Sequence, residues 1–151
     1  MCIPKPIYLL LFFSLFLANC TGSRPDDLGI RSGKLKPCPP TPNCVSSMEN
    51  PSDKEHYMSP VAFSRSVPEL IYVIKKSIEN RPRTQIIKEE PAYIYFENTS
   101  LIMRYVDDSE FFVDEKKKEL HFRSASRLGS SDIGVNRKRM SELLEAIQKK
   151  E

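Results

Sequence analysis

Residues 110–125, EFFVDEKKKELHFRSA, contain two β-type runs on either side of a charged turn. Apolar and aromatic side chains gather in Glu110–Asp114, every residue of Glu115–Lys118 is charged, and Glu119–Ala125 is again rich in large apolar residues. Short runs of this composition, joined by a few polar residues, are typical of antiparallel strands. The stretch therefore predicts two consecutive antiparallel strands.

Further β-type runs precede this pair. Thr84–Lys88 and Ala92–Asn98 are separated by the turn Glu89–Pro91, and Ser100–Val106 is rich in large apolar and aromatic residues. The acidic pair Asp107-Asp108 then separates Ser100–Val106 from Glu110. Strands that follow one another through short turns favour an antiparallel meander.

Two segments repeat apolar residues with the period of a helix. The first starts at Pro68, which suits a helix N-terminus, and should end near Asn80. The second includes Met140 and Ile147 and leads to lysines at its C-terminal end. Each helix has one apolar face, so both are predicted to cover one side of the sheet. The expected fold is α+β, an antiparallel sheet of about four to five strands with two helices on one face, a two-layer sandwich.

Length and composition narrow the class of protein. A chain of 151 residues suits one modest domain, and 40% hydrophobic with 28% charged residues excludes disorder of the whole chain. The 23 basic and 20 acidic residues are interspersed and leave a net charge of only +3, so a nucleic-acid-binding protein is not indicated. No cofactor is expected.

Residues 1–20, MCIPKPIYLLLFFSLFLANC, have the features of a signal peptide. Lys5 precedes the apolar run Ile7–Ala18, which as a helix would rise only about 18 Å. A bilayer has a hydrocarbon core of roughly 30 Å, so a permanent transmembrane helix is not expected. A signal peptide fits the pattern better.

The end of this leader resembles the lipobox of bacterial lipoproteins. Leu17, Ala18 and Cys20 occupy the expected positions, whereas Asn19 stands where a smaller residue is usual. The resemblance implies a diacylglycerol on the Cys20 thiol, cleavage just before it, and attachment to a bacterial membrane on its periplasmic or outer side. A plain signal peptide with an incidental cysteine is the alternative.

These features divide the chain into three segments. Residues 1–19 are predicted to be a lipoprotein signal peptide, and residues 37–151 a single α+β domain. Between them, residues 21–36 hold three of the five glycines and show no helical or strand period. Residues 20–36 are therefore predicted to form a flexible tether.

Cys38 and Cys44 lie in the proline-rich run KPCPPTPNCVSS. An even pair of cysteines in an exported protein predicts a disulfide. A metal site with His56 as third ligand is the alternative, but C-x-x-x-x-x-C is not a common zinc spacing and no second cysteine pair is present. A redox pair is weakly supported, because its usual spacing is C-x-x-C.

Residues 123–137, RSASRLGSSDIGVNR, link the last predicted strand to the last predicted helix, with Asn136 as the expected N-cap. Two interpretations are open. The arginines could form an ion-pair network with the acids of residues 107–110, or they could complete an anion pocket built from a Gly/Ser loop and a helix N-terminus. The candidate residues for either site are Arg104, Asp107, Asp108, Glu110, Arg123, Ser124, Ser126, Arg127, Asp132, Asn136 and Arg137.

The same segments resemble a bacterial family, DUF1499, a domain of unknown function. The matching blocks are Pro37-Cys38-Pro39 with Pro42–Ser47, Tyr105–Asp108 with Glu110, and Arg123–Arg127 with Gly129, Asp132, Gly134, Asn136 and Arg137. The resemblance covers about residues 37–148. It implies an exported or membrane-associated protein and places the acidic and arginine-serine blocks in one unit, but it implies no activity.

Two functions remain as hypotheses. The first is a membrane-anchored lipoprotein domain of the cell envelope, a non-enzymatic binding or structural module whose partner is an unknown protein or an anionic ligand. The second is an envelope hydrolase or transferase that uses Asp107, Asp108 and Glu110 with Ser126 or His56. Catalytic motifs are sparse: neither Ser124 nor Ser126 lies in a G-x-S-x-G context, His56 is expected in a loop, and His121 is expected to face solvent.

Overall fold

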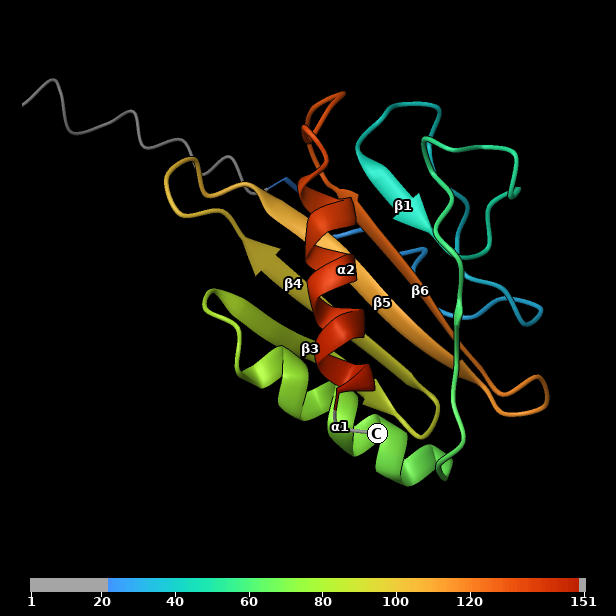
Figure 1. The fold of residues 1–151 in the computed structure, drawn as a ribbon. Coiled ribbons are helices and arrows are strands. Elements are labelled where there is room, and N and C mark those ends of the chain that lie inside the picture. Colours follow the sequence, from blue (N-terminus) through green and yellow to red (C-terminus); the bar gives the residue numbers. More distant parts are fainter. Residues whose placement is uncertain (1–21, 150–151) are drawn as a thin grey trace, which may run out of the picture.

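The computed structural model describes residues 22–149, so the predictions for the leader and for Cys20 lie outside the described residues. The elements in chain order are β1 (Cys44–Ser46), β2 (Val61–Ala62), α1 (Val67–Glu79), β3 (Thr84–Glu90), β4 (Tyr93–Thr99), β5 (Val106–Asp114), β6 (Glu119–Ser126) and α2 (Val135–Gln148). The antiparallel sheet has the order β1-β6-β5-β4-β3, and β2 also pairs with β6. Both helices cover one face (Figure 1), which confirms the α+β sandwich.

The first helix begins and ends where its sequence signals predict. Both the backbone N–H and the hydroxyl of Ser66 donate to Glu69 Oε2, at 3.1 and 2.6 Å, and Pro68 lies in the first turn. The helix ends at Glu79, just before Asn80 and the Arg81–Pro82 step, because a residue that precedes proline disfavours helical geometry. The predicted helix is confirmed.

The start of α2 differs from the expectation. Its N-cap is Gly134, with a left-handed φ of 76°, rather than Asn136. Asp132 accepts hydrogen bonds from two backbone N–H groups at this helix start: Gly134 N lies 3.0 Å from one carboxylate oxygen and Asn136 N lies 2.7 Å from the other. Asn136 is fully buried inside the helix, where its amide bonds to strand residues. The expected N-cap was therefore wrong.

The strands depart from the prediction in three places. Glu89 and Glu90 were expected in the turn Glu89–Pro91, but they belong to β3. Ser100–Val106 was expected to be a strand, but residues 100–105 form an exposed loop in which Arg104 has a φ of 59°. Strand β5 instead begins at Val106 and continues without a break through Asp107 and Asp108. The short strands β1 and β2 were not predicted, because two or three residues give too little periodicity.

The main core lies between the sheet and the helices. Phe96, Phe111 and Phe122 lie on three neighbouring strands and have no solvent exposure. The ring centroid of Phe111 lies 5.7 Å from that of Phe96 and 6.5 Å from that of Phe122. Full burial of a side chain of this size stabilises a fold by about 1.5–3 kcal/mol. Apolar residues of both helices, including Ile74 and Met140, pack on these rings. Among residues 22–149, neither helix combines the length and apolarity that crossing a bilayer requires.

The opposite face of the sheet, called here the back face, is covered by the N-terminal part of the described chain. These residues, coloured blue in Figure 1, run behind the strands. Leu35 is 4% exposed and packs with Tyr93 and Tyr95, and Leu28 adds to the same contact. Several residues for which the sequence predicts a tether, among them Leu28 and Leu35, thus lie against the domain.

Candidate functional site

Strand alternation divides the polar residues of β5 and β6 between the two faces of the sheet. Asp107 and Ser109 face the helices, together with Ser124 and Ser126 of β6. The intervening residues face the back. The helix-side cluster consists of Asn98, Asp107, Ser109, Ser124, Ser126, Asn136 and Arg139. The back-side cluster consists of Arg24, Tyr93, Tyr95, Glu97, Asp108, Glu110, Arg123 and Arg127.

Arg127 is the centre of the back-side cluster. Its Nε and Nη2 lie 2.8 and 2.7 Å from the two carboxylate oxygens of Asp108, a bidentate pairing, and Nη2 also donates to Glu97. Tyr95 donates to Asp108 at 2.5 Å. The side chains of Arg127 and Asp108 are 6% and 3% exposed, so water screens the pair little. Hydrogen bonds to Asp108 raise the pKa of Arg127, which keeps its charge.

Glu97 connects this cluster to the N-terminal segment. Arg24 donates from Nε to Glu97 Oε1 at 2.6 Å. Burial by itself would raise the pKa of Glu97, but hydrogen bonds from Arg24, Tyr95 and Arg127 outweigh it and lower the pKa. Glu97 is therefore ionised at neutral pH, and it binds both arginines.

Glu110 is fully buried in the same cluster. Its Oε1 accepts hydrogen bonds of 2.8 Å from Tyr93 Oη and from Gly29 N, while its Oε2 lies 3.7 Å from Arg123 Nη1. Burial raises the pKa of Glu110 and lowers that of Arg123. Within residues 22–149, neither Glu110 Oε2 nor Arg123 Nε has a hydrogen-bond partner. The buried charges of Glu110 and Arg123 are thus less well compensated by hydrogen bonds than those of Asp108 and Arg127.

The helix-side cluster joins α2 to the sheet. Arg139 Nη2 lies 2.6 Å from Asp107 Oδ2, and Arg139 Nη1 lies 2.7 Å from Asn136 Oδ1. Ser124 donates to the same Asn136 oxygen at 2.5 Å. Because Arg139 is paired with an acid, its charge near the positive end of the α2 dipole is compensated.

The remaining polar residues extend this cluster across the sheet. Ser109 Oγ lies 2.8 Å from Ser124 Oγ and accepts a 3.1 Å hydrogen bond from Asn98. Asn136 Nδ2 donates to Ser126 Oγ at 3.1 Å. Buried polar groups in a low-dielectric interior need such partners, so the cluster forms a connected hydrogen-bonded network.

The structure thus brings most of the candidate residues together as ion pairs and hydrogen bonds, but three lie elsewhere. Arg104 is exposed in the loop before β5. Asp132 caps α2 instead of joining a cluster. Arg137 donates to the backbone oxygens of residues 54, 55 and 57 rather than to an acid.

Sequence reasoning missed several members of the clusters. Arg139, not Arg137, reaches the acidic block, and its spacing of three residues from Asn136 on a helix was an available signal. Tyr93, Tyr95 and Glu97 were also missed, since their strand positions suggested only core and surface. All three alternate onto the back face of β4.

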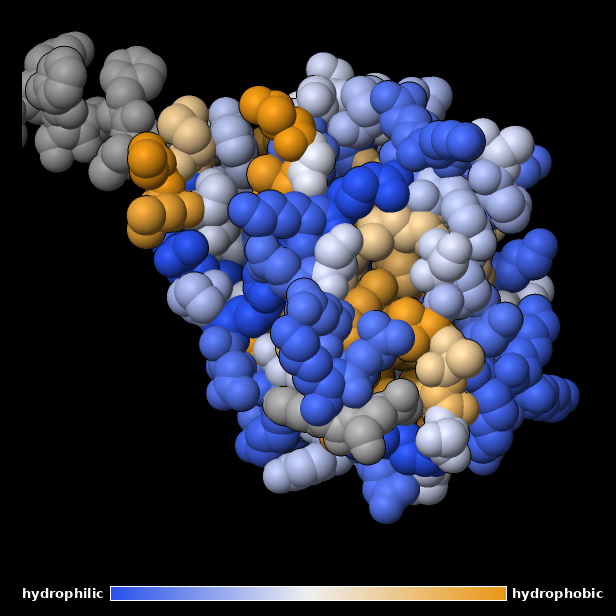
Figure 2. All heavy atoms as spheres, viewed as in Figure 1, coloured by the Kyte–Doolittle hydropathy of each residue, from blue (hydrophilic) through white to orange (hydrophobic). Residues whose placement is uncertain are grey.

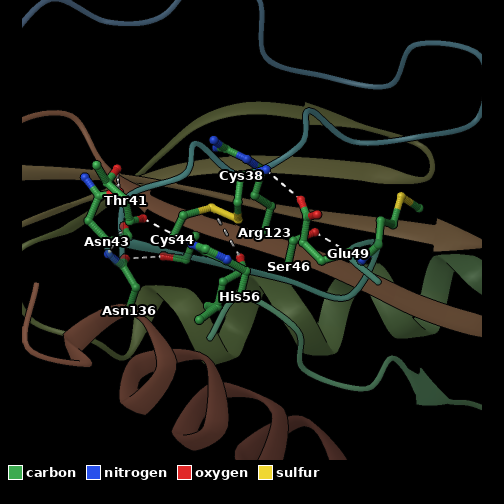
Figure 3. The surroundings of a disulfide bond; sticks show 12 residues. Cys38, Thr41, Asn43, Cys44, Ser46, Glu49, His56, Arg123 and Asn136 are labelled. Carbon is green, nitrogen blue, oxygen red and sulfur yellow. Dashed lines mark hydrogen bonds between the residues drawn. A yellow bond between two sulfur atoms is a disulfide. The ribbon is translucent and has the colours of Figure 1, made fainter. Parts of the chain in front are cut away.

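The Cys38–Cys44 disulfide is present, which confirms the predicted bridge (Figure 3). Its loop is held at both ends: Glu49 accepts a 2.6 Å hydrogen bond from Cys38 N, and Asn43 donates to Gly129 O at 2.6 Å. Asn43 O also accepts from Ser126 N at 3.0 Å. The bridge therefore closes the proline-rich run on itself, and the hydrogen bonds of Asn43 connect this run to the end of β6 and to the segment after it.

The two histidines are held by other partners. His56 Nδ1 lies 2.8 Å from Asp53 Oδ2, and its Nε2 lies 3.2 Å from Thr41 O. Burial opposes protonation of His56, but these partners outweigh it and raise the pKa. His121 was expected to face solvent, yet it is 6% exposed with Nδ1 3.1 Å from Ser47 Oγ. That expectation was wrong, because the residues before β1 and around Ser47 cover this end of the back face.

A basic cleft of about 390 Å³ opens beside the helix-side cluster, between the start of β3 and α2. Four cations and two acids line it, namely Arg81, Arg83, Lys138, Arg139, Asp107 and Glu142. Arg139 is paired with Asp107, and Arg81 lies 2.7 Å from Glu142. Within the part of the chain that the structure describes, Arg83 and Lys138 are in no ion pair. The cleft is thus net positive.

Glu110 makes the stability of the fold depend on pH. Its pKa is raised on folding, so the folded state holds the proton more tightly than the unfolded chain does. The stabilisation from this group is complete below the ordinary value of 4.5 and is lost as pH rises through the folded pKa. We expect the free energy of unfolding of the wild type to fall relative to Glu110→Gln between about pH 4 and about pH 8, measured by urea unfolding.

Glu79→Gln is the matched control, because Lys76 lowers the pKa of exposed Glu79 and its effect has the opposite sign. The assignment would be contradicted if the free energy of unfolding of the wild type, relative to that of Glu110→Gln, stayed constant or rose with pH.

Comparison with known proteins identifies the family of the chain. A family model described as "Protein of unknown function (DUF1499)" matches residues 34–147. The match includes every member of both clusters except Arg24, and it includes the disulfide. A search of curated proteins finds no match. The chain belongs to the DUF1499 family, whose function is unknown.

Proposed function

We propose that the protein is a membrane-anchored, non-enzymatic module of the cell envelope that binds an anionic group in the basic cleft. The observation that carries the proposal is the pair of exposed cations, Arg83 and Lys138, which line the cleft and form no close ion pair among residues 22–149, although Lys138 interacts with Glu142 at longer range. The anchor is supported by the lipobox-like run before Cys20.

The arrangement of the acids argues against the enzymatic alternative. A general acid or base must reach the substrate, either directly or through one water. Both oxygens of Asp108 are bound by Arg127, Asp107 is paired with Arg139, and Glu110 has no solvent exposure. These carboxylates are better explained as structural ion pairs than as catalytic groups.

The proposed serine and histidine partners are also engaged elsewhere. Ser126 accepts a hydrogen bond from Asn136, and His56 is bound to Asp53 and to a backbone carbonyl. No hydrogen bond joins Ser126 to His56 in residues 22–149. A nucleophile needs an adjacent base for activation, and this pair lacks that contact.

The cleft suits a small oxyanion such as a phosphate or carboxylate group. Two cations supply charge, while Thr99 and Ser100 offer hydroxyl groups around them; the hydroxyl of Thr84 already donates within the protein. Exposed charges interact through a high dielectric, so the affinity should be weak and should decrease with salt.

We expect inorganic phosphate to shift the backbone amide resonances of residues around Arg83 and Lys138 in an NMR titration at low ionic strength. The double variant Arg83→Ala/Lys138→Ala should bind at least about tenfold more weakly, because both unpaired charges are removed. Lys149→Ala, at the far end of α2, is the control and should bind as the wild type does. Equal titration curves for the double variant and the wild type would refute the anion site.

The anchor is tested on the full chain expressed in a bacterial host. We expect the mature protein to begin at Cys20 with a diacylglycerol mass on the thiol, and Cys20→Ala to leave the membrane fraction. The Cys38→Ser/Cys44→Ser variant is the control, since it loses the disulfide and should keep the lipid. Protein that retains Met1, or Cys20 without added lipid mass, would overturn the anchor.

A further inference from the structure

Exposed hydrophobic side chains are concentrated at one end of the molecule. Nine large hydrophobic residues are exposed among residues 22–149. Seven of them come from residues 101–105, 128–133 and the start of α2, and we call these seven the apolar end: Leu101, Ile102, Met103, Tyr105, Leu128, Ile133 and Val135. Ile102 and Ile133 are 84% and 96% exposed. Figure 2 shows orange side chains at the loop between β4 and β5 and above the start of α2.

The backbone brings these segments together. Arg127 N donates to Val106 O at 3.1 Å, so the segment that follows β6 is joined to the start of β5, and Leu128 and Tyr105 are the next residues on either side of this contact. Val135 lines the basic cleft together with Ser100, the first residue of the β4–β5 loop. The apolar end is therefore one surface formed by two neighbouring loops and the start of a helix.

The first described residue lies on this surface. A Cβ atom built on Gly22 would lie 3.2 Å from Leu128 Cγ, so the backbone of Gly22 is in close contact with the apolar end. Cys20 precedes Gly22 by two residues, which can span at most about 7 Å. A lipid on the Cys20 thiol would consequently start near the part of the apolar end that Leu128 forms.

We propose that the apolar end inserts into the interface of the membrane that holds the Cys20 lipid and so fixes the orientation of the domain on the bilayer. The inference rests on the anchor of the proposed function. Protruding apolar loops can bury their side chains at the boundary between headgroups and acyl chains. The anchor holds the loops next to the bilayer, so even weak insertion is favoured by a high effective concentration.

The charges around the apolar end fit a membrane that contains anionic lipids. Arg104 lies within the loop, and Arg83 and Lys138 line the cleft beside it. Long cationic side chains can place their stems along apolar groups and their charges among headgroups. With insertion at this end, the cleft would open toward the membrane surface.

The chain has no tryptophan, so Ile102→Trp introduces a single fluorescent reporter at a residue that makes few contacts. We expect the emission of the full, acylated variant to shift to shorter wavelength in phosphatidylethanolamine–phosphatidylglycerol vesicles and to be quenched by lipids labelled on their acyl chains. Tyr72→Trp is the control: Tyr72 is 61% exposed on α1, away from the apolar end, and its variant should show neither effect.

The outcomes separate this inference from the anchor. Unchanged emission of the acylated Ile102→Trp variant in vesicles would overturn insertion while leaving the anchor intact. If mass spectrometry finds no lipid at Cys20, the anchor fails, and the same reporter is measured with vesicles added to the unmodified protein. A shift there would still support insertion, and its absence would overturn it. A shift that depends on protein concentration without vesicles would instead assign the surface to a second copy of the chain.

Discussion

The bidentate ion pair between Arg127 and Asp108 is the constraint on which the rest of the structure depends. Strand β5 lies in the middle of the sheet although two acids follow its first residue, and three of its four carboxylates, those of Asp107, Asp108 and Glu110, are buried. A buried charge without a partner costs several kcal/mol, so β5 can occupy this place only if cations follow it there. On the back face they are Arg123 of β6 and Arg127, the residue that follows β6, and on the helix side Arg139 of α2.

The two clusters also explain why β6 pairs with β5 in only one register. A slip of β6 by one residue against β5 would exchange the faces, moving Arg127 toward the helices and Ser126 toward the back. Asp108 would then lose its partner. The back-side cluster further binds the N-terminal segment, through Arg24 to Glu97 and Gly29 to Glu110, so charge pairing fixes the part of the chain that leads from Cys20.

Because the acids are paired inside the domain, the groups left at its surface are better guides to function. The basic cleft and the apolar end are adjacent. Val135 belongs to both, and Ser100, which lines the cleft, directly precedes Leu101 of the apolar end. Gly22 lies at the same end. With the proposed anchor at Cys20, the cleft and the apolar end would both lie near the membrane, and the proposed anionic ligand would be bound there.

Much of this architecture could be predicted from local signals. Helix α1 has a capping serine and a proline in its first turn, and Cys38 and Cys44 lie close together in a proline-rich run, so both features were found from sequence. The pairing of arginines with the acidic block was one of two interpretations. The structure favours it because a helix N-terminus already capped by Asp132 offers few free N–H groups to an anion.

Other features depend on tertiary contacts that no local pattern encodes. Whether Arg137 or Arg139 reaches Asp107 is decided by the rotation of α2 on the sheet. Leu101, Ile102 and Met103 have the composition of a strand but protrude in a loop, so composition alone gave the wrong element. The cover on the back face depends on a few apolar residues such as Leu35 in a glycine-rich segment, which is too weak a pattern to detect.

A double-mutant cycle on Asp108 and Arg127 tests the central claim most directly. Urea unfolding would be measured for the wild type, Asp108→Asn, Arg127→Met and the double variant, with Arg104→Ala as an exposed control expected to cost less than about 0.5 kcal/mol. The account predicts a loss of about 3–5 kcal/mol for Arg127→Met, since Asp108 is left buried and unpaired, and a coupling of about 2 kcal/mol or more. Single losses that add in the double variant to within about 0.5 kcal/mol would contradict it.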